Sequence, residues 1–425
     1  MNETSYLKRH YPQEQQDSLS YKILFFLIWP FGAWLYCFKQ PQYKSSYIIF
    51  FLFSLLLCWH MSPMSNSGYD DFIGIKERFE YAFISTSDLI YEIDAYFSMA
   101  DDAPKELYED ILTWFVKGFT NNYHFFFLLA AIPIALCQLK SMKFITSDLH
   151  FKSSFWGIVV LSLFIFPRDI ITTQNPRFAT GFWICVLCTI YYYGSGKRDW
   201  KYLLLSLFAP LCHSGLMPFV LVLFLSVFMP RKMTVLKYVA LFSIPFSFFD
   251  AGLLGNISFD FMPDHFARWI NEYMSDESYA KFILKQGRSG FWWVDAGFLM
   301  LMKVAYIWMT FQIIKNWDRV EKNTESYNII SFYLILFTFV NFTQFVPEFS
   351  TRYYNFLRVF CIYVWFKTFG LDKNYISSVK LLMIACSWFV LNRYGYILGG
   401  ALSVNTPIDI FYMPLPYLMG KGLIW

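Results

Sequence analysis

The sequence contains few charged residues for its length. Charged side chains make up 16% of its 425 residues and hydrophobic ones 56%, whereas soluble domains average about a quarter charged. The formal net charge of +4 is small and gives no reason to expect nucleic-acid binding. This composition excludes an ordinary soluble domain and indicates a polytopic membrane protein.

Other common signals are also missing. The first 20 residues are polar and lack the basic region, apolar core and cleavage site of a signal peptide. All eight cysteines lie inside apolar runs, so we interpret them as small lipophilic side chains rather than disulfide partners. No Cys or His spacing is typical of a metal site. We therefore expect neither a metal nor a cofactor, and no fixed-period repeat is visible.

Long apolar runs, by contrast, are abundant. A membrane-spanning helix needs about 20 mostly apolar residues, and about 17 are tolerated. The stretch 201–229 is too long for one span and too short for two straight ones, and residues 210–215 break it, so we expect two short helices there. The other candidate segments are 23–38, 46–62, 123–139, 154–167, 177–193, 235–250, 294–314, 327–346, 353–369 and 378–395.

These segments predict an all-α polytopic membrane protein. It would form a single integral membrane domain over residues 1–425, with about 11–12 transmembrane or re-entrant helices. Its connections would include two large extracytoplasmic loops, 63–122 and 251–293, of which the first is strongly acidic.

Lysine placement predicts the orientation of these segments. Short cytoplasmic loops of membrane proteins carry an excess of Lys and Arg, and lysine-bearing loops here alternate with lysine-poor connections. If inward and outward loops alternate along the chain, the N-terminus lies outside despite its basic residues. The Pro30-X-Gly32 break offers an alternative, in which segment 23–38 is re-entrant. The loops assigned to the cytoplasm contain Lys39/Lys44, Lys140/Lys143/Lys152, Lys197/Arg198/Lys201, Arg231/Lys232/Lys237, Lys315/Arg319/Lys322 and Lys367/Lys373/Lys380.

The outward connections 168–177 and 347–358 contain arginine but no lysine. A guanidinium stays charged in a poorly hydrated site and presents a planar fork of donors to phosphate or carboxylate oxygens. Ionisable groups at membrane depth usually mark a substrate route or a paired partner. The alternative is that each arginine reaches the lipid headgroups or pairs with Asp169 or Glu348. The arginines concerned are Arg168, Arg177, Arg352 and Arg358.

Arg177 has informative neighbours. Asn175 and Pro176 precede it and predict a helix start, because proline at the first turn leaves no unsatisfied donor. Thr180 and Gly181 then share a face with Arg177 at three- and four-residue spacing, which allows another helix or a ligand to approach closely. We expect this face to contribute to a polar, aromatic-lined pocket beneath the outer surface.

Several short motifs occur in order along the chain: a G-x-D run at 68–72, then 112–115, 119–123, 176–179, 203–214 and Arg352. Together they resemble the EpsG-like, Wzy-type polysaccharide polymerases over about residues 55–360. Asp71-Phe72 departs from the aromatic and tyrosine pattern commoner in that family, and the polar N-terminal extension departs as well.

The resemblance implies a glycosyltransferase that polymerises O-antigen, capsule or exopolysaccharide. Such an enzyme passes one undecaprenyl-pyrophosphate-linked oligosaccharide onto the terminal hydroxyl of another and releases undecaprenyl pyrophosphate. It would lie in the bacterial inner (cytoplasmic) membrane with its active site facing the periplasm or cell exterior. The implied partners are these lipid-linked oligosaccharides, the bilayer, a chain-length regulator and a flippase, and no nucleic acid.

Residue roles follow from this reaction. Negative charge builds on the leaving pyrophosphate, so preplaced arginines would stabilise the transition state more than the ground state. Arg177 and Arg352 are the predicted clamp, with Arg358 and Arg168 as further candidates.

The acceptor hydroxyl could use a general base. Asp70, Asp71 and His213 are the candidates, although the two aspartates would equally cap a helix and the histidine would equally mark a kink. Trp292 and Trp293, at the end of the second large loop, are the predicted sugar-stacking platform, although such aromatics also form interfacial belts.

Three alternatives remain open. An outer-leaflet glycosyltransferase with a lipid-monophosphate sugar donor would also carry acidic residues early in its first outer loop, as Asp70-Asp71 does. A transporter or flippase of lipid-linked glycans would favour broken helices in matched halves, and no duplication is visible. A polysaccharide ligase would share the lipid donor and the arginines.

Overall fold

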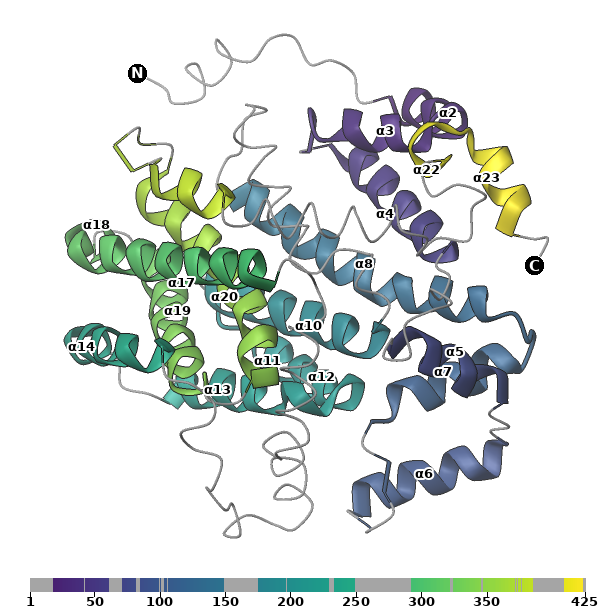
Figure 1. Ribbon diagram of the computed structural model, residues 1–425, viewed down its shortest axis with the longest axis horizontal. Coiled ribbons are helices and arrows are strands. Elements are labelled where there is room, and N and C mark those ends of the chain that lie inside the picture. Colours follow the sequence, from purple (N-terminus) through teal and green to yellow (C-terminus); the bar gives the residue numbers. More distant parts are fainter. Residues whose placement is uncertain are drawn as a thin grey trace.

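The structure, a computed structural model, is all-α in the residues it describes, as the sequence predicted (Figure 1). The number of membrane crossings and the division into loops stay predictions. The described residues are 18–41, 43–60, 71–81, 85–98, 100, 103–104, 106–148, 175–195, 197–228, 233–248, 292–321, 324–344, 347–370, 372, 374–375, 377–384 and 409–422.

Most of the predicted apolar segments coincide with helices. Two of these helices are long and apolar enough to cross a bilayer, Tyr123–Asp148 and Ala296–Lys315. The segment 154–167 lies outside the described residues, and 378–395 is described, as helix, only as far as 384. The matching helices are α4 (Lys44–Trp59), α8 (Tyr123–Asp148), α10 (Pro176–Thr189) with a π-helical continuation η3 (Ile190–Gly194), α14 (Met233–Ser243) with a 3-10 continuation η5 (Ile244–Phe248), α17 (Trp292–Lys315), α19 (Thr324–Phe342) and α20 (Pro347–Phe369).

The predicted segment 23–38 is not one straight helix. It forms α2 (Leu19–Ile28) and α3 (Pro30–Cys37), which pack against each other. Trp29 has a non-helical backbone between them, and Pro30 begins the second helix. The Trp29 ring lies where a β-carbon on Gly32 would be, so this fold depends on glycine at that position.

The stretch 201–229 breaks where the sequence predicted. Its parts are α11 (Trp200–Ser206), α12 (Phe208–Cys212), the short 3-10 turn η4 (Ser214–Leu216) and α13 (Met217–Phe228). His213 has an extended backbone, with φ −156° and ψ 116°, between α12 and η4. The residues of this turn are buried, so the break lies inside the protein.

The first large loop, 63–122, contains three helices rather than open chain. They are α5 (Asp71–Tyr81), α6 (Thr86–Ser98) and α7 (Tyr108–Lys117). Figure 1 shows α5 and α7 beside the N-terminal part of α8, and α6 packs on α7 farther from α8. In α7 the side chains of Glu109, Thr113 and Val116 are buried. Their three- and four-residue spacing gives α7 one buried face, and this face packs toward α8 and α12.

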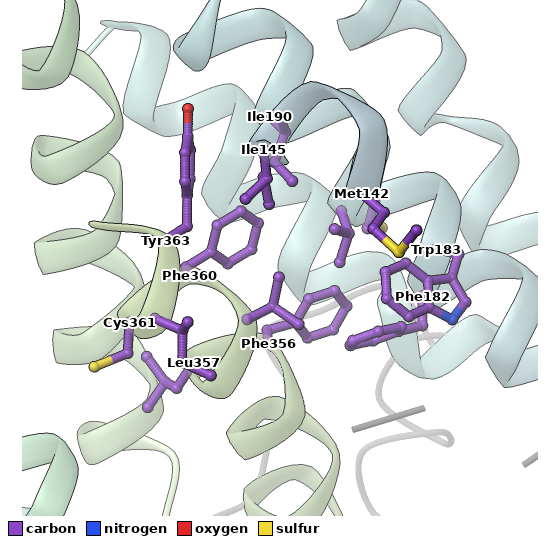
Figure 2. Close-up of a cluster of buried hydrophobic side chains, with 14 of the residues drawn as sticks. Met142, Ile145, Phe182, Trp183, Ile190, Phe356, Leu357, Phe360, Cys361 and Tyr363 are labelled. Carbon is purple, nitrogen blue, oxygen red and sulfur yellow. The ribbon is translucent and has the colours of Figure 1, made fainter. Parts of the chain in front are cut away.

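Helices α8, α10 and α20 share an aromatic core (Figure 2). Phe182 of α10 and Phe356 of α20 are fully buried, and their ring centroids lie 4.4 Å apart. Phe219 of α13 stacks on Phe356 at 4.1 Å. Because close-packed interiors transmit displacements, this cluster sets the distance between the first turn of α10 and the first turns of α20.

A polar contact ties α8 to α20 at the far end of this core. Asp148, the last residue of α8, accepts hydrogen bonds from the Tyr363 hydroxyl and the Lys367 ammonium group, each at 2.7 Å. Charge-assisted bonds of this length are the stronger kind. The two helices are therefore joined at that end by charge as well as by packing.

The C-terminal helices pack on the N-terminal ones. α22 (Asp409–Tyr412) contacts α3, and α23 (Leu415–Gly422) contacts α2, side by side in Figure 1. The Trp29 indole donates a hydrogen bond of 2.6 Å to the Phe411 carbonyl. The sequence predicted no such closure, and it also did not predict the short α18 (Trp317–Glu321) that follows α17.

Gly181 tests the packing of α10 against the break. A β-carbon there would overlap the Leu216 side chain and lie 2.9 Å from the Ala209 carbonyl oxygen, which is backbone and cannot rotate away. We expect Gly181→Ala to destabilise the protein by about 1–3 kcal/mol, the usual cost of overpacking. Thermal unfolding of the detergent-purified protein measures this effect.

Gly297→Ala in α17 is the matched control. A β-carbon at Gly297 meets nothing within 4 Å, and replacing a mid-helix glycine with alanine usually stabilises by about 0.5–1 kcal/mol. Equal unfolding temperatures for the two variants would contradict the close approach at Gly181.

Candidate functional site

The first turn of α10 positions Arg177. The Asn175 side chain accepts a hydrogen bond of 3.1 Å from the Phe178 N–H, and Pro176 is the first helical residue. The helix start predicted from Asn175-Pro176 is therefore confirmed. Thr180, on the same face, donates a hydrogen bond of 3.2 Å to the Tyr108 hydroxyl, which joins α10 to α7.

Arg177 makes ion pairs with two glutamates of the first large loop. Its Nη1 lies 2.9 Å from Glu106 Oε2, and its Nε lies 3.2 Å from Glu109 Oε2. The Arg177 side chain is 24% exposed, whereas each glutamate side chain is 8% exposed. A paired carboxylate was one of the alternatives for this arginine, and the structure places Glu106 and Glu109 in that role. The proposed partner Asp169 lies outside the described residues, as does the side chain of Glu348.

The two ion pairs of Arg177 are close but poorly aligned. Glu106 Oε2 and Arg177 Nε are buried, yet neither has a hydrogen bond of acceptable geometry. Glu109 differs, because Arg78 of α5 donates two aligned bonds to it, from Nε at 2.8 Å and from Nη2 at 3.2 Å. Aligned, bidentate guanidinium–carboxylate contacts are stronger than misaligned ones, so Arg78 binds Glu109 more firmly than Arg177 binds Glu106.

The other oxygen of Glu106 contacts the buried break between α12 and η4. Oε1 accepts a hydrogen bond of 3.3 Å from the Ser214 N–H and lies 3.4 Å from His213 Nδ1. The Gly215 carbonyl accepts a hydrogen bond of 2.7 Å from the Tyr353 hydroxyl. Buried backbone groups need such partners, so Glu106 and Tyr353 replace bonds that a continuous helix would have made.

His213 is buried at the break with a defined hydrogen bond. The Gly215 N–H donates to His213 Nδ1 at 3.0 Å. A neutral imidazole whose Nδ1 accepts carries its proton on Nε2. In this arrangement Nε2 is a donor, which suits contact with an anion better than removal of a proton.

Arg352 joins the same cluster from α20. Its guanidinium carbon lies 5.5 Å from the centroid of the Phe178 ring, and its Nη1 would be 3.2 Å from a β-carbon on Gly215. The Phe178 ring in turn meets the His213 imidazole edge-on, with centroids 5.2 Å apart. The structure therefore brings together three predicted residues, Arg177, Arg352 and His213.

Burial and charge together set the protonation of Glu106. Burial raises the pKa of its carboxyl, and the positive charge of Arg177 and the Ser214 N–H offset this only in part. Glu109 adds to the rise and Arg352 opposes it. The net pKa is raised, so this carboxyl binds a proton more readily than an exposed glutamate does.

The other residues predicted for the site do not join this cluster or lie outside the described residues. Arg358 is buried on α20 and faces α17, where its Nε lies 3.4 Å from the Tyr306 hydroxyl and its Nη2 3.5 Å from Met302 Sδ. Trp293 is 61% exposed in the first turn of α17. Asp71 begins α5, but its side chain and that of Trp292 lie outside the described residues, as do Asp70 and Arg168 entirely.

Sequence reasoning did not select Glu106, Glu109 or Arg78 as site residues. The sequence shows that the loop 63–122 is acidic, but it does not show which of its carboxylates meet Arg177. The available signal is that Glu106 and Glu109 flank Tyr108, the first residue of α7. Two carboxylates close together before and within the first turn of one helix are candidate ion-pair partners for an arginine in the first turn of another. Across the described part of the chain, no group of three or more His, Cys, Asp or Glu side chains is arranged to hold a metal ion.

The fold and the site together define a class: an all-α chain with bilayer-length apolar helices, in which arginines pair with buried carboxylates at an internal helix break. The sequence model of the EpsG family matches residues 110–397, which is more than half of the chain, and the protein belongs to that family. The match includes Arg177, His213 and Arg352 but begins after Glu106, Glu109 and the G-x-D run. Comparisons with curated proteins and with solved structures give no match.

Family membership associates the chain with exopolysaccharide biosynthesis. Together with the two long apolar helices, it indicates a membrane protein. The family resemblance predicted from the motif order is thus confirmed, although the matched region starts later and ends later than the motifs suggested.

Asp110 of α7, next to Glu109, offers a test by pH. Burial, followed by the charges of Glu92 and Glu109, raises its pKa to about 7. A carboxyl with a raised folded pKa contributes stability at low pH that is lost as the pH rises from about 4 to about 7. We expect Asp110→Asn to unfold at a higher temperature than the wild type above pH 7, with the difference shrinking toward pH 4. A difference that does not change with pH would contradict the raised pKa.

Proposed function

We propose that this protein is a polysaccharide polymerase. It transfers an undecaprenyl-pyrophosphate-linked oligosaccharide repeat unit onto the terminal hydroxyl of another, on the outer face of the bacterial cytoplasmic membrane, and releases undecaprenyl pyrophosphate. The observation that carries the proposal is the convergence of Arg177 and Arg352, from different helices, on one buried break within the region that matches the family.

The reaction needs positive charge at the leaving group. The acceptor oxygen bonds to C1 of the donor sugar as the bond from C1 to the phosphate oxygen breaks, and the electron pair stays with the pyrophosphate. Preplaced cationic donors stabilise that developing charge. Arg177 is 24% exposed, and a guanidinium has five N–H donors. Its contacts with two glutamates therefore leave donors available for an oxyanion.

The membrane setting supports the same proposal. Helices α8 and α17 supply two apolar stretches of bilayer length. The lysine-free connections that carry Arg177 and Arg352 would face outward under the positive-inside rule, where lipid-linked repeat units become available for polymerisation. The partners would be those lipid-linked oligosaccharides, with a flippase and a chain-length regulator acting before and after.

The second candidate is an outer-leaflet glycosyltransferase that uses a lipid-monophosphate sugar donor. It is favoured by the position of Glu106 and Glu109, two acidic residues of the first large loop, beside Arg177. Such an enzyme would add single sugars and would produce no regular ladder of repeat units.

The arginine fork can be tested by a conservative substitution. We expect Arg177→Lys and Arg352→Lys each to lower the polymerisation rate about 100-fold or more, as loss of one preplaced donor to an oxyanion usually does, because lysine retains the charge but loses the planar fork. The assay supplies purified protein with lipid-pyrophosphate-linked repeat units and resolves the ladder of products.

Arg319→Lys serves as the control variant. Arg319 forms an exposed pair with Asp372 at 3.3 Å, away from the α10 start, so its substitution should leave the ladder unchanged. Full activity of Arg177→Lys would overturn the clamp. Sugar transfer from a lipid monophosphate, with no ladder from authentic pyrophosphate-linked units, would favour the second candidate.

A further inference from the structure

Glu106 connects the arginine of the site to the helix break through its two carboxylate oxygens. Oε1 is held by the Ser214 N–H at 3.3 Å, whereas Oε2 faces Arg177 Nη1 at 2.9 Å without an aligned hydrogen bond. The side chain is 8% exposed. The backbone of Ser214 therefore fixes Oε1, whereas Oε2 has only a poorly aligned ionic contact with Arg177.

The contact of Glu106 with Arg177 is the one that an incoming anion can replace. Phosphate oxygens match the guanidinium fork and form parallel N–H···O bonds with it. Both contacts of Arg177 lack an aligned hydrogen bond, but Glu109 stays in place and paired, because Arg78 holds it by two aligned bonds of 2.8 and 3.2 Å. A pyrophosphate that binds Nη1 of Arg177 thus takes the position of Glu106 Oε2.

Loss of its contact with Arg177 changes the proton affinity of the Glu106 carboxylate. The guanidinium is the largest influence that keeps this buried carboxyl ionised, and burial acts against it with greater effect. When a pyrophosphate binds Arg177, Glu106 is still buried, but the positive charge of Arg177 is now shared between Glu106 and the pyrophosphate. The carboxylate then favours a bound proton more strongly than before.

We propose that Glu106 exchanges Arg177 for a proton during the reaction: a pyrophosphate oxygen of the donor replaces Glu106 on Arg177, and the freed carboxylate accepts the proton of the acceptor hydroxyl. The acceptor oxygen bonds to C1, the bond from C1 to the phosphate oxygen breaks with its electron pair on pyrophosphate, and the proton moves to Glu106. This inference rests on the proposed polymerase function, and it assigns to Glu106 the base role for which His213, Asp70 and Asp71 were the sequence candidates.

The arrangement at His213 is consistent with this assignment. Its Nδ1 accepts from the Gly215 N–H, so the neutral ring presents Nε2–H as a donor. Proton removal from a hydroxyl needs an acceptor, which Glu106 supplies and this tautomer of His213 does not. Because the base is released by the donor's own pyrophosphate, the acceptor is activated after the donor has bound.

Pyrophosphate binding tests the exchange without any catalytic assay. Isothermal titration of the purified full-length protein with inorganic pyrophosphate, in two buffers of different ionisation enthalpy, gives both the affinity and the protons taken up. We expect Glu106→Gln to bind pyrophosphate several-fold more tightly than the wild type, because the competing carboxylate is gone. We also expect the wild type to take up more protons per pyrophosphate than Glu106→Gln, by up to one.

Glu80→Gln is the matched control, because Glu80 forms an exposed i,i+4 pair with Lys76 at 3.5 Å on α5. It should behave as the wild type in both measurements. A Glu106 that only supports the fold would give the opposite result, since its loss would weaken pyrophosphate binding. Weaker binding, or equal proton uptake, in Glu106→Gln therefore overturns the exchange.

Turnover separates this inference from the proposed function. In the ladder assay we expect Glu106→Gln to lose transfer and Glu106→Asp, a shorter carboxylate, to retain part of it. In the wild type, the acidic limb of kcat, which reports the bound complex, should lie at higher pH than that of kcat/KM, which reports the free enzyme.

If wild-type protein forms a ladder and Glu106→Gln forms it equally fast, the base role fails while the polymerase stands. If the wild type forms no ladder, the polymerase fails, and the titrations with pyrophosphate still decide whether Glu106 and pyrophosphate compete for Arg177. If Glu106→Gln does not fold, Glu106→Asp replaces it. This variant should also bind pyrophosphate more tightly than the wild type, and weaker binding overturns the exchange.

Discussion

A helix that breaks inside a protein must have its freed backbone groups bonded, and in this chain that requirement organises the site. The break lies between α12 and η4, and its partners come from separate elements: the Glu106 carboxylate, the Tyr353 hydroxyl and the Leu107 N–H, which donates to the Leu211 carbonyl at 3.2 Å. Unbonded groups there would each cost roughly 1–3 kcal/mol. The same bonds place Glu106 from the first large loop beside α10, and α20 beside the break.

Once these elements converge, charge compensation determines their contacts. Glu106 near a buried break needs a cation, and Arg177 supplies one from the first turn of α10. Glu109 is shared between Arg177 and Arg78, which links the site to α5 at the surface. A cluster of this kind resists burial unless it is paired, and neither contact of Arg177 has an aligned hydrogen bond; the proposed exchange uses the contact with Glu106. The pair that compensates charge at the break is therefore also the pair on which the proposed mechanism acts.

Much of the fold was predictable because it follows from local rules. Hydropathy located most helices, proline and glycine located the breaks at Trp29 and His213, and Asn175-Pro176 located the start of α10. The helices of the 63–122 loop were not predicted, because their mixed composition resembles a polar loop until one face is buried. The packing of α22 on α3 was likewise not predictable from the sequence, since it depends on contacts between residues far apart in the chain, such as Trp29 and Phe411.

The sequence alone specified the all-α class and the family, and it singled out Arg177 as a candidate, because composition, motif order and an unusual residue type are properties of the chain itself. Tertiary packing determined which carboxylates pair with Arg177. Among the acidic residues of one loop, nothing in the sequence distinguishes Glu106 from Glu80, which forms an exposed pair with Lys76. The distinction comes from the hydrogen bonds that join Tyr108 to Thr180 of α10 and Leu107 to Leu211 of α12, next to which Glu106 is buried 2.9 Å from Arg177. A carboxylate's chemistry depends on its burial and its nearest charges, and these exist only after the helices have come together.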